Sequence, residues 1–289
     1  VQRKGMLLNV LILGGNGYLG SKVTRQLIKA GNCVVCTKRQ SSYLSRLSDL
    51  EKSINWIPAS IDSVDTATKY TPFDYVLNMA CNYGRENVLY DNVLDANIEF
   101  PLKVLNKTVE RGTKKFITIG TGLPDELNMY SFSKKMMNEF GRFYSEKHGI
   151  DFCSLQLEMF YGADEPGNRF LPSIIDGMIK GAPIDMTLGT QRRDIISVED
   201  IIKAVITVFH SDLHGYHEVP VGTGIAPTIS EIVDFIWEET GKKSKLNKGA
   251  VPLRKNEPDC VADITKISSI GPWNPIPWKQ GIKQMIEIM

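Results

Sequence analysis

A run of glycines constrains the fold of this chain more than any other segment: Gly14-Gly15-Asn16-Gly17-Tyr18-Leu19-Gly20 follows a short apolar run at 7–13. Glycine permits a tight turn here and lets backbone N–H groups approach a pyrophosphate at the start of the following helix. The G-x-x-G-x-x-G spacing alone is a weak signal, but it lies between an expected strand and an expected helix, which is the context that dinucleotide binding requires. The expected cofactor contacts in this turn are Gly14, Asn16, Gly17, Tyr18, Leu19 and Gly20.

The first half of the chain alternates β-rich runs with helical patterns. Strands are expected at 7–13, 33–38, 54–58, 75–79, 115–119 and 151–157, and helical patterns lie at 18–30, 44–50, 90–111 and 128–148. Strands that alternate with helices at this spacing are typical of a parallel sheet wound in both directions. The sequence therefore predicts an α/β protein with a doubly wound parallel (Rossmann) sheet. Pro101 falls inside the third of these helical patterns and is expected to kink it.

After Tyr161 the regular alternation of strand and helix patterns ends, and glycine and proline residues interrupt shorter elements. We therefore expect a dinucleotide-binding domain at 1–163, joined by part of 190–215, whose helix at 198–210 packs back on the first layer. The rest of 164–289 is expected to form a smaller, carboxyl-terminal substrate-binding domain. A chain of 289 residues is long enough for two domains with cores of their own.

The overall composition is that of an ordinary globular protein, with 42% hydrophobic residues, 23% charged residues and a formal net charge of +1. No nucleic-acid or membrane partner is expected, because the charge is nearly balanced and the apolar run at 7–13 is too short to span a bilayer. Five cysteines, an odd number without a disulfide framework, indicate a reducing, cytoplasmic environment. No metal is expected, since His210, His214 and His217 lack a surrounding carboxylate–histidine motif.

The end of the second expected strand bears on the choice of cofactor. Proteins that bind NAD usually place an acid there to hold the ribose 2′-hydroxyl, but this chain has Lys38 and Arg39, and the next acid is Asp49. Two cations suit a 2′-phosphate, so NADP(H) is favoured and NAD(H) stays possible. Asp62, which follows the third expected strand, is placed to accept a hydrogen bond from the adenine amine.

A Y-x-x-x-K pattern, Tyr130-Ser131-Phe132-Ser133-Lys134, opens the helix expected at 128–148. The spacing puts the phenol and the ammonium group on one helical face, where the positive charge favours the phenolate. Tyr130 is then suited to exchange a proton with a hydroxyl or a ketone near neutral pH. Thr121, at the end of the preceding strand, carries a hydroxyl that can hydrogen-bond the reacting oxygen.

With these motifs, the chain resembles the extended short-chain dehydrogenase/reductase family of sugar-nucleotide epimerases, dehydratases and 4-ketoreductases. The resemblance covers essentially the whole chain and rests on Gly14-x-x-Gly17-x-x-Gly20, Asp62, Asn78-Met79-Ala80, Asn97, Thr121, Tyr130-x-x-x-Lys134, Tyr161-Gly162, Arg193-Asp194 and Val198-Glu199-Asp200. It implies catalysis by Thr121, Tyr130 and Lys134, and a place for Asn97 in the active-site hydrogen-bond chain. The further cofactor contacts that it implies are Met79, Ala80, Asn97 and Lys134.

Three segments, 79–85, 120–124 and 157–163, resemble more narrowly the CDP-paratose and CDP-abequose synthases. That likeness implies reduction by NADPH of the 4-keto group of a CDP-linked 3,6-dideoxyhexose, in lipopolysaccharide O-antigen biosynthesis. Dehydratases of the family carry an Asp-Glu pair directly after the catalytic threonine, and Gly122 and Leu123 stand there instead, so a 4,6-dehydratase is not expected. Met159 replaces the asparagine that many members use to hold the diphosphate.

Other side chains are therefore expected to bind the nucleotide-sugar, in a pocket between the two domains. Arginine forks suit a diphosphate, and the resemblance implies that Arg193 binds a phosphate of the nucleotide. The residues expected at the substrate are Tyr83, Arg85, Arg169, Arg193, Arg254 and Glu257.

Two other functions compete with the 4-ketoreductase. A 4-epimerase would use the same scaffold, but epimerases normally keep NAD, and Lys38 and Arg39 weigh against that cofactor. A non-catalytic dinucleotide-sensing protein would normally lose Tyr130 or Lys134, and both are intact. We also expect a homodimer through the helices at 91–111 and 128–148, because the second of these carries apolar residues on more than one face.

Overall fold

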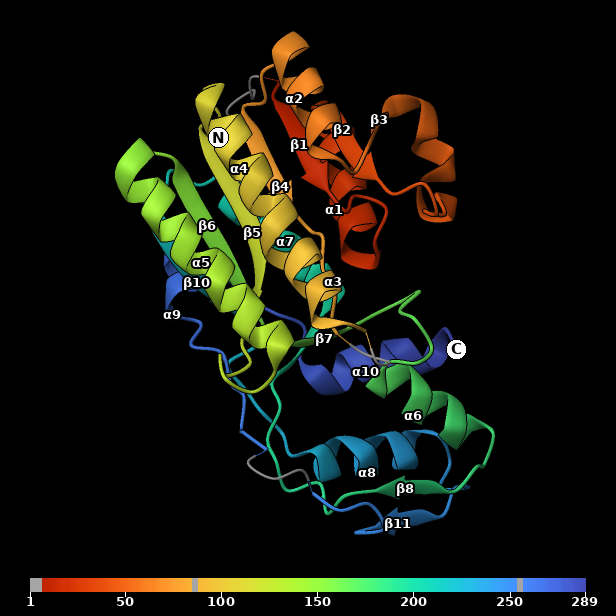
Figure 1. The fold of residues 1–289 in the computed structure, drawn as a ribbon. Coiled ribbons are helices and arrows are strands. Elements are labelled where there is room, and N and C mark those ends of the chain that lie inside the picture. Colours follow the sequence, from red (N-terminus) through yellow and green to blue (C-terminus); the bar gives the residue numbers. More distant parts are fainter. Residues whose placement is uncertain (1–6, 85–87, 254–256) are drawn as a thin grey trace. The chain divides into compact units, whose positions relative to one another are not determined.

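The computed structural model describes residues 7–84, 88–253 and 257–289. Its largest sheet has seven strands in the order β10-β6-β5-β4-β1-β2-β3 (Figure 1). These strands are β1 (Asn9–Leu13), β2 (Cys33–Lys38), β3 (Asn55–Pro58), β4 (Tyr75–Asn78), β5 (Lys115–Thr121), β6 (Asp151–Leu157) and β10 (Tyr216–Val221). β1 pairs in parallel with β2 and β4, β2 with β3, and β4 with β5. The predicted α/β fold with a doubly wound parallel sheet is confirmed.

The sheet grows in two directions from β1. The chain adds β2 and β3 on one side of β1 and then returns to add β4, β5 and β6 on the other. Sheets of this kind bind ligands at the carboxyl ends of their strands, beside the point where the winding direction reverses. Leu13 and Asn78, the last residues of β1 and β4, are partners in register. The segments that follow these two strands therefore emerge side by side.

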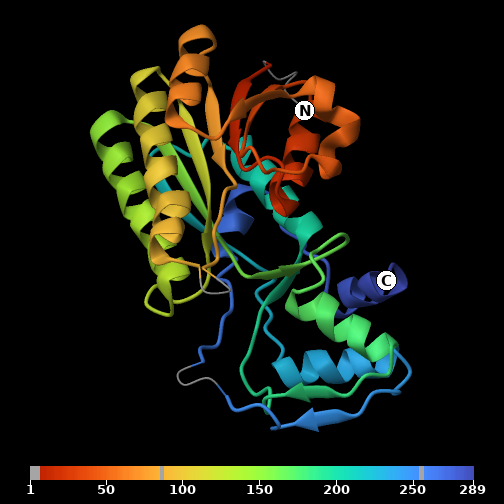
Figure 2. The ribbon, with the colours of Figure 1, turned by 45° about the vertical axis from the view of Figure 1, so that its right-hand side comes forward.

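Helices cover both faces of the sheet (Figure 2). One face carries α2 (Ile61–Tyr70), α4 (Phe100–Glu110) and α5 (Met129–His148), and the other carries α1 (Tyr18–Lys29) and the carboxyl-terminal part of α7 (Val198–Phe209). Under the first group of helices the strands and helices share one hydrophobic core. Its buried members include Leu11, Leu13, Val76, Val104, Leu105, Phe116, Met137 and Phe152.

The start of α5 is fixed by a capping box. The Asn128 side chain accepts a hydrogen bond from the Ser131 amide at 2.9 Å, and the Ser131 hydroxyl accepts one from the Asn128 amide at 3.2 Å. Such reciprocal bonds satisfy two of the N–H groups that a helix start leaves without an intrahelical partner. Because the helix begins at Met129, Tyr130 lies in its first turn and Lys134 follows one turn later.

Three helical segments differ from the sequence-based expectation. α2 lies outside the helical patterns expected from the sequence; its start is marked by Ser60, whose hydroxyl accepts from the Ser63 amide. The pattern at 44–50 forms a 3₁₀-helix, η1 (Ser45–Ser53), with non-helical dihedral angles at Leu47. The pattern at 90–111 forms α3 (Tyr90–Leu94), a π-helical turn η2 (Asp95–Glu99) and α4, and Pro101 lies in the first turn of α4, where proline is tolerated.

The chain divides into two compact units, Val1–Gln156 with Val205–Val219, and Leu157–Ala204 with Pro220–Met289. In the second unit, β7 (Met159–Tyr161) pairs with β9 (Ile195–Ser197), and β8 (Ile184–Met186) pairs with β11 (Leu246–Lys248). Its helices include α6 (Phe170–Ile179), α8 (Ile229–Glu239), α9 (Thr265–Ile270) and α10 (Trp278–Glu287). This unit has its own hydrophobic core, which includes Tyr161, Ile175, Ile195, Ile232 and Ile282.

Candidate active site

The glycine turn joins β1 to α1 in a form that suits a pyrophosphate. Gly14 has a φ of +74°, and its carbonyl accepts a hydrogen bond from the Gly17 amide at 3.0 Å. A Cβ on Gly20 would overlap the Gly14 carbonyl oxygen, so only glycine lets helix and turn approach so closely. Gly17 caps α1 without any side-chain bond, and the first turn of α1 has no acid. The amino end of α1 therefore lacks an anion of its own, which fits the phosphate groups of a dinucleotide.

The segment after β4 lies directly against this turn. A Cβ built on Gly14 would lie 2.9 Å from the backbone nitrogen of Ala80 and 3.2 Å from the carbonyl carbon of Met79. The Met79 amide donates to the Leu13 carbonyl at 2.9 Å, which continues the β1–β4 pairing by one step. The structure thus brings Met79 and Ala80 to the turn that contains Gly14, although the two segments are far apart in the sequence.

The end of β2 carries the two cations considered for the cofactor phosphate. Lys38 is half-buried with its Nζ 6.0 Å from the centre of the Trp56 ring, and Arg39 is exposed in a turn closed by Ser42. Asn16 of the glycine turn reaches this loop, since its Nδ2 donates to the Tyr43 carbonyl at 3.5 Å. The first acid after β2, Asp49, is held by Arg25 of α1, with Oδ1 and Nη2 2.8 Å apart. Asp49 is thus engaged elsewhere, and the lowered pKa of its carboxyl follows from that bond.

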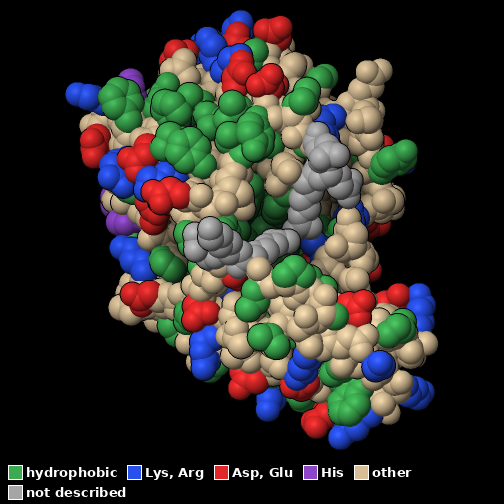
Figure 3. All heavy atoms as spheres, turned by 60° about the horizontal axis from the view of Figure 1, so that its bottom comes forward, with side chains coloured by type: hydrophobic (Ala, Val, Ile, Leu, Met, Phe, Trp, Pro, Cys, Tyr) green, Lys and Arg blue, Asp and Glu red, His purple; other side chains and the backbone are tan. Residues whose placement is uncertain are grey.

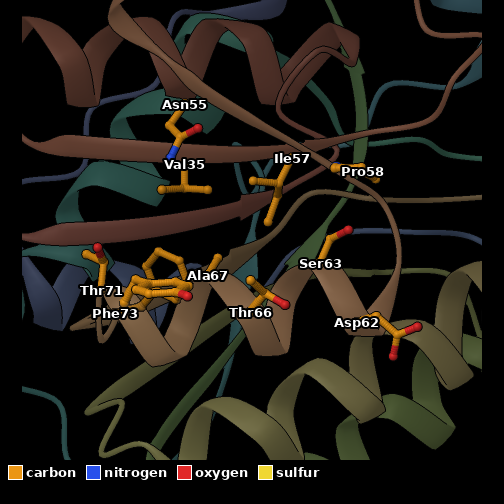
Figure 4. Close-up of a pocket in the computed structure, with 11 residues that line it drawn as sticks. Val35, Asn55, Ile57, Pro58, Asp62, Ser63, Thr66, Ala67, Thr71 and Phe73 are labelled. Carbon is orange, nitrogen blue, oxygen red and sulfur yellow. The ribbon is translucent and has the colours of Figure 1, made fainter.

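A pocket of about 450 Å³ lies between α2 and the strands β2 and β3 (Figure 4). Its lining includes apolar side chains and hydroxyl groups, and Asp62 lies at its Pro58 end, in the first turn of α2. Because β3 is parallel to its neighbours, Asp62 stands at the carboxyl edge of the sheet, on the side of β1 that also carries Lys38. The adenine contact expected for Asp62 requires this edge and stays a prediction.

Thr121, Tyr130 and Lys134 occupy the end of β5 and the first turns of α5. The Lys134 side chain is buried, with an exposed fraction of 3% for the residue, and its Nζ lies 6.0 Å from the centre of the Tyr130 ring. The Tyr83 ring packs on Tyr130, with ring centres 5.1 Å apart and planes tilted by 38°. Tyr83, which was expected at the substrate, therefore lies beside the phenol that was expected to exchange the proton.

Asn97 is fully buried in the π-helical turn η2 and makes three hydrogen bonds. Its Oδ1 accepts from the Asn82 amide at 2.8 Å, and its Nδ2 donates to the Asn82 carbonyl at 2.8 Å and to the Ser133 hydroxyl at 2.9 Å. The Ser133 hydroxyl in turn donates to the Tyr130 carbonyl at 2.7 Å. Asn97 thus ties the segment after β4 to the helix that carries Tyr130 and Lys134.

Thr121 is held from two sides. Its hydroxyl accepts a hydrogen bond from the Leu123 amide at 3.3 Å, and its own amide donates to Oε1 of Gln156, on β6, at 2.9 Å. Gln156 is held in turn, since its Nε2 donates to the Ser154 hydroxyl at 3.1 Å and to the Glu218 carboxylate at 3.2 Å. A side chain from the neighbouring strand therefore fixes the backbone of Thr121.

In the second unit, Arg193 is buried and surrounded by acceptors. It forms an ion pair with Glu257 and donates to the carbonyl groups of Arg192 and Pro258. Burial raises the pKa of the nearby Glu158 to about 7, the Asp194 carboxylate adds to this rise, and the Arg193 guanidinium opposes it. Arg193 thus pairs with Glu257 and, by its charge, also acts on Glu158.

The remaining residues expected at the substrate are described only in part. Arg169 caps the start of α6, 3.8 Å from the Glu165 carboxylate, with its guanidinium 5.6 Å from the centre of the Phe160 ring. Arg85 and Arg254 lie outside the described residues. Among the residues that the structure does describe, no group of three or more His, Cys, Asp or Glu side chains could hold a metal ion.

Three residues that contact the expected site were not singled out from the sequence: Asn82, Ser133 and Gln156. Gln156 had a signal, because Ser154 and Gln156 are polar residues at alternate positions of β6, whose other residues after Asp151 are apolar. Asn82 and Ser133 lie in the quoted segments 79–85 and 130–134, but nothing in these segments indicates their contacts, which depend on how α5 packs against the segment after β4.

A doubly wound sheet with a glycine turn and a Thr/Tyr/Lys group defines the class of Rossmann-fold oxidoreductases, and comparison with known proteins agrees. The model of the NAD dependent epimerase/dehydratase family matches residues 10–222. This chain belongs to that family and is an oxidoreductase-type enzyme. Across the described ranges, none of the helices combines the length and the apolar character needed to cross a membrane.

Individual relatives share about a quarter of their residues with this chain. It is 26% identical to the CDP-abequose synthase of Salmonella typhimurium, an alignment that covers 96% of this chain and 97% of that protein. It is 27% identical to a putative UDP-glucose 4-epimerase of Methanocaldococcus jannaschii, over 97% of this chain and 98% of that one. Its fold matches the crystal structure of the UDP-glucose 4-epimerase of Thermotoga maritima with a TM-score of 0.85, at 21% identity and over 97% of this chain and 98% of that one.

Proposed function

We propose that this enzyme reduces the 4-keto group of a nucleotide-linked deoxyhexose with NADPH. The name of its relatives, CDP-abequose synthase, denotes an enzyme that forms a nucleotide-linked sugar of this class. One observation carries the proposal: Thr121 ends β5, Tyr130 and Lys134 lie in the first turns of α5 with the Lys134 Nζ 6.0 Å from the centre of the Tyr130 ring, and Gly122 and Leu123 stand where dehydratases have their acidic pair. These residues are suited to proton transfer, and the acidic pair that would eliminate water does not follow Thr121. The CDP-abequose synthases of Salmonella and Yersinia among the relatives support the same reaction.

Each residue of the group has a defined part in this reaction. Tyr130 donates a proton to the C4 oxygen of the sugar, and Thr121 hydrogen-bonds the same oxygen. Lys134 favours the phenolate that remains and binds the ribose of the cofactor. NADPH supplies the hydride when it is bound. Arg169 offers a guanidinium group to the diphosphate of the substrate, whereas the Arg193 guanidinium, also expected there, is held by Glu257 and two backbone carbonyls.

A 4-epimerase is the second candidate, and a specific observation favours it. The relative from Methanocaldococcus jannaschii carries that name, and its alignment covers nearly the whole of both chains. An epimerase returns the hydride to the sugar that lost it, so it consumes no reduced cofactor. Lys38 and Arg39 favour the reductase, because a 2′-phosphate distinguishes NADPH from the NAD that epimerases normally keep.

The test follows the absorbance of NADPH in the presence of a panel of nucleotide-linked 4-keto-6-deoxyhexoses and 4-keto-3,6-dideoxyhexoses, with CDP, UDP, dTDP and GDP as carriers. We expect consumption of NADPH with one of them, and no interconversion of UDP-glucose and UDP-galactose. Tyr130→Phe should lower kcat by about 10²- to 10⁴-fold while NADPH still binds, because the ring stays and only the proton donor is lost.

A matched control is Tyr70→Phe, which changes a tyrosine that is 85% exposed on α2 and should leave kcat unchanged. Near wild-type kcat in Tyr130→Phe would exclude Tyr130 as the proton donor. Interconversion of UDP-glucose and UDP-galactose without consumption of NADPH would replace the reductase by the epimerase.

A further inference from the structure

We infer that Gln156 is a positioning residue that holds Thr121 in place for the reaction. This inference rests on the proposed function, which gives Thr121 its part at the C4 oxygen. Gln156 does not belong to the Thr/Tyr/Lys group, and it stands on a different strand, 35 residues further along the chain. Its side-chain amide nevertheless makes the hydrogen bond that the backbone of Thr121 donates.

The orientation of the Gln156 amide is determined by its neighbours. A backbone N–H can only donate, so the Thr121 amide requires the oxygen of the side chain, which lies 2.9 Å away. An ionised carboxylate can only accept, so Glu218 requires the nitrogen, which lies 3.2 Å away. With these two partners on opposite sides, a flipped amide would lose both bonds, and one arrangement is selected.

Glu218, the partner of the Gln156 side-chain nitrogen, is itself held in place. The Glu218 carboxylate of β10 accepts a hydrogen bond from the Tyr216 hydroxyl, and the Arg142 guanidinium of α5 lies 3.8 Å from it. Arg142 also lies 4.9 Å from the centre of the Tyr216 ring. Gln156 is therefore the last member of a polar chain that begins on α5 and ends at the backbone of Thr121.

The sequence beside Thr121 leaves room for this contact. A Cβ on Gly120 would overlap Oε1 of Gln156 and would lie 2.8 Å from both Cδ of Gln156 and Oγ of Ser154. Any other residue at 120 would push the amide away from the Thr121 N–H. Because Gly120 has no side chain, it leaves the space that the Gln156 amide occupies.

The experiment has a kinetic part. Gln156→Met keeps the length and removes the hydrogen bond, and it should lower kcat about tenfold, because a small displacement of a reacting group is costly, while the KM for the sugar and the Kd for NADPH stay unchanged. In a Thr121→Ala background the same change should lower kcat no further, since a residue that acts through the Thr121 hydroxyl has nothing left to act on. A further loss in that background, as from general damage to the structure, would overturn the inference.

Exchanging the side chains of Gln156 and Glu218 tests the inference even if Gln156→Met folds poorly. Gln156→Glu should lower kcat because two carboxylates then face each other, and the double variant Gln156→Glu/Glu218→Gln should recover most of the wild-type kcat, since donor and acceptor have only changed places. Failure of this recovery would count against the inference even if Gln156→Met did not fold.

A second readout does not depend on activity. Hydrogen exchange at the Thr121 amide should be slow in the wild type and at least tenfold faster in Gln156→Met. Equal exchange in both proteins would overturn the inference. If the wild type reduced no nucleotide-linked 4-ketosugar, the proposed function would fail, and exchange at Thr121 would still decide whether Gln156 holds this residue.

Discussion

At the scale of single residues, Lys38 and Arg39 are the side chains on which the cofactor preference depends. Lys38 is half-buried beside Trp56, Arg39 is exposed, and the nearest following acid, Asp49, is bound by Arg25. No acid of β2 or of the loop after it is therefore available for a ribose hydroxyl in the described part of the chain.

We predict that the wild type binds NADPH more tightly than NADH and that Lys38→Asp/Arg39→Asn reverses the order. Charged hydrogen bonds contribute about 1.5–3 kcal/mol each, so loss of one contact should change the preference by about 10- to 100-fold and loss of both by about 10²- to 10⁴-fold. Fluorescence titration of both proteins with both cofactors measures it. Arg46→Asn, in η1 of the same region, serves as the control. Equal affinities of the wild type for NADPH and NADH would show that Lys38 and Arg39 do not bind the 2′-phosphate.

The raised pKa of Glu158 predicts that the stability of the protein depends on pH. Burial raises its pKa from 4.5 to about 7, with a further rise from Asp194 and an opposing effect of Arg193. Between these two values the folded protein holds a proton that the unfolded chain has lost, so the free energy of unfolding falls as the pH rises through this range.

We predict that Glu158→Gln reduces the fall of the free energy of unfolding with pH, by up to about 3 kcal/mol between pH 4.5 and 7.5, because an amide cannot ionise. Urea unfolding at several pH values measures the difference. Glu146→Gln, an exposed position at the end of α5, should keep the wild-type dependence. The same fall in the wild type and in Glu158→Gln would mean that Glu158 does not ionise in this window.

At the scale of elements, the β1–α1 turn is the part most sensitive to a single methyl group. We predict that Gly20→Ala destabilises the protein by about 1–3 kcal/mol and weakens NADPH at least tenfold, since the added Cβ would overlap the Gly14 carbonyl and open the turn. Urea unfolding and NADPH titration test both effects. A Cβ on Gly167 meets nothing within 4 Å, so Gly167→Ala should change neither quantity. A Gly20→Ala protein with normal NADPH affinity would contradict the proposed phosphate site.

At the scale of the whole molecule, α5 presents an apolar face that the single chain leaves exposed. Phe132, Phe140 and Phe143 are 44%, 39% and 53% exposed, and Met137 of the same helix is buried in the core. Leu94 of α3 is 36% exposed, and hydrophobic side chains gather on one face of the molecule (Figure 3). Monomers rarely expose large apolar patches, so a second copy is the proposed cover for the helices expected at the dimer interface.

We predict that the wild type sediments as a dimer at micromolar concentration and that Phe140→Glu/Phe143→Glu sediments as a monomer, because charges would be buried in the interface. Tyr70→Glu, at an exposed aromatic residue of α2, should leave the dimer intact. A wild type that stays monomeric at this concentration would exclude this interface.

The sequence by itself determined the elements whose signals are local. The strands at 33–38 and 151–157 have the bounds that their apolar runs predicted, and α5 begins beside Asn128 because its cap is formed by neighbouring residues. The glycine turn and the Tyr130–Lys134 spacing could be read in the same way, since turn and helix geometry depend on adjacent residues.

Only the tertiary structure decided the contacts between distant segments. Gln156 meets the Thr121 amide from 35 residues away, and Arg193 meets Glu257 from 64 residues away, so that a guanidinium expected at the substrate is already engaged by acceptors of its own unit. Such pairs depend on the order and register of the strands and on the packing of loops against them. No periodicity within either segment encodes them, because the energy that selects each contact arises only when the whole core has formed.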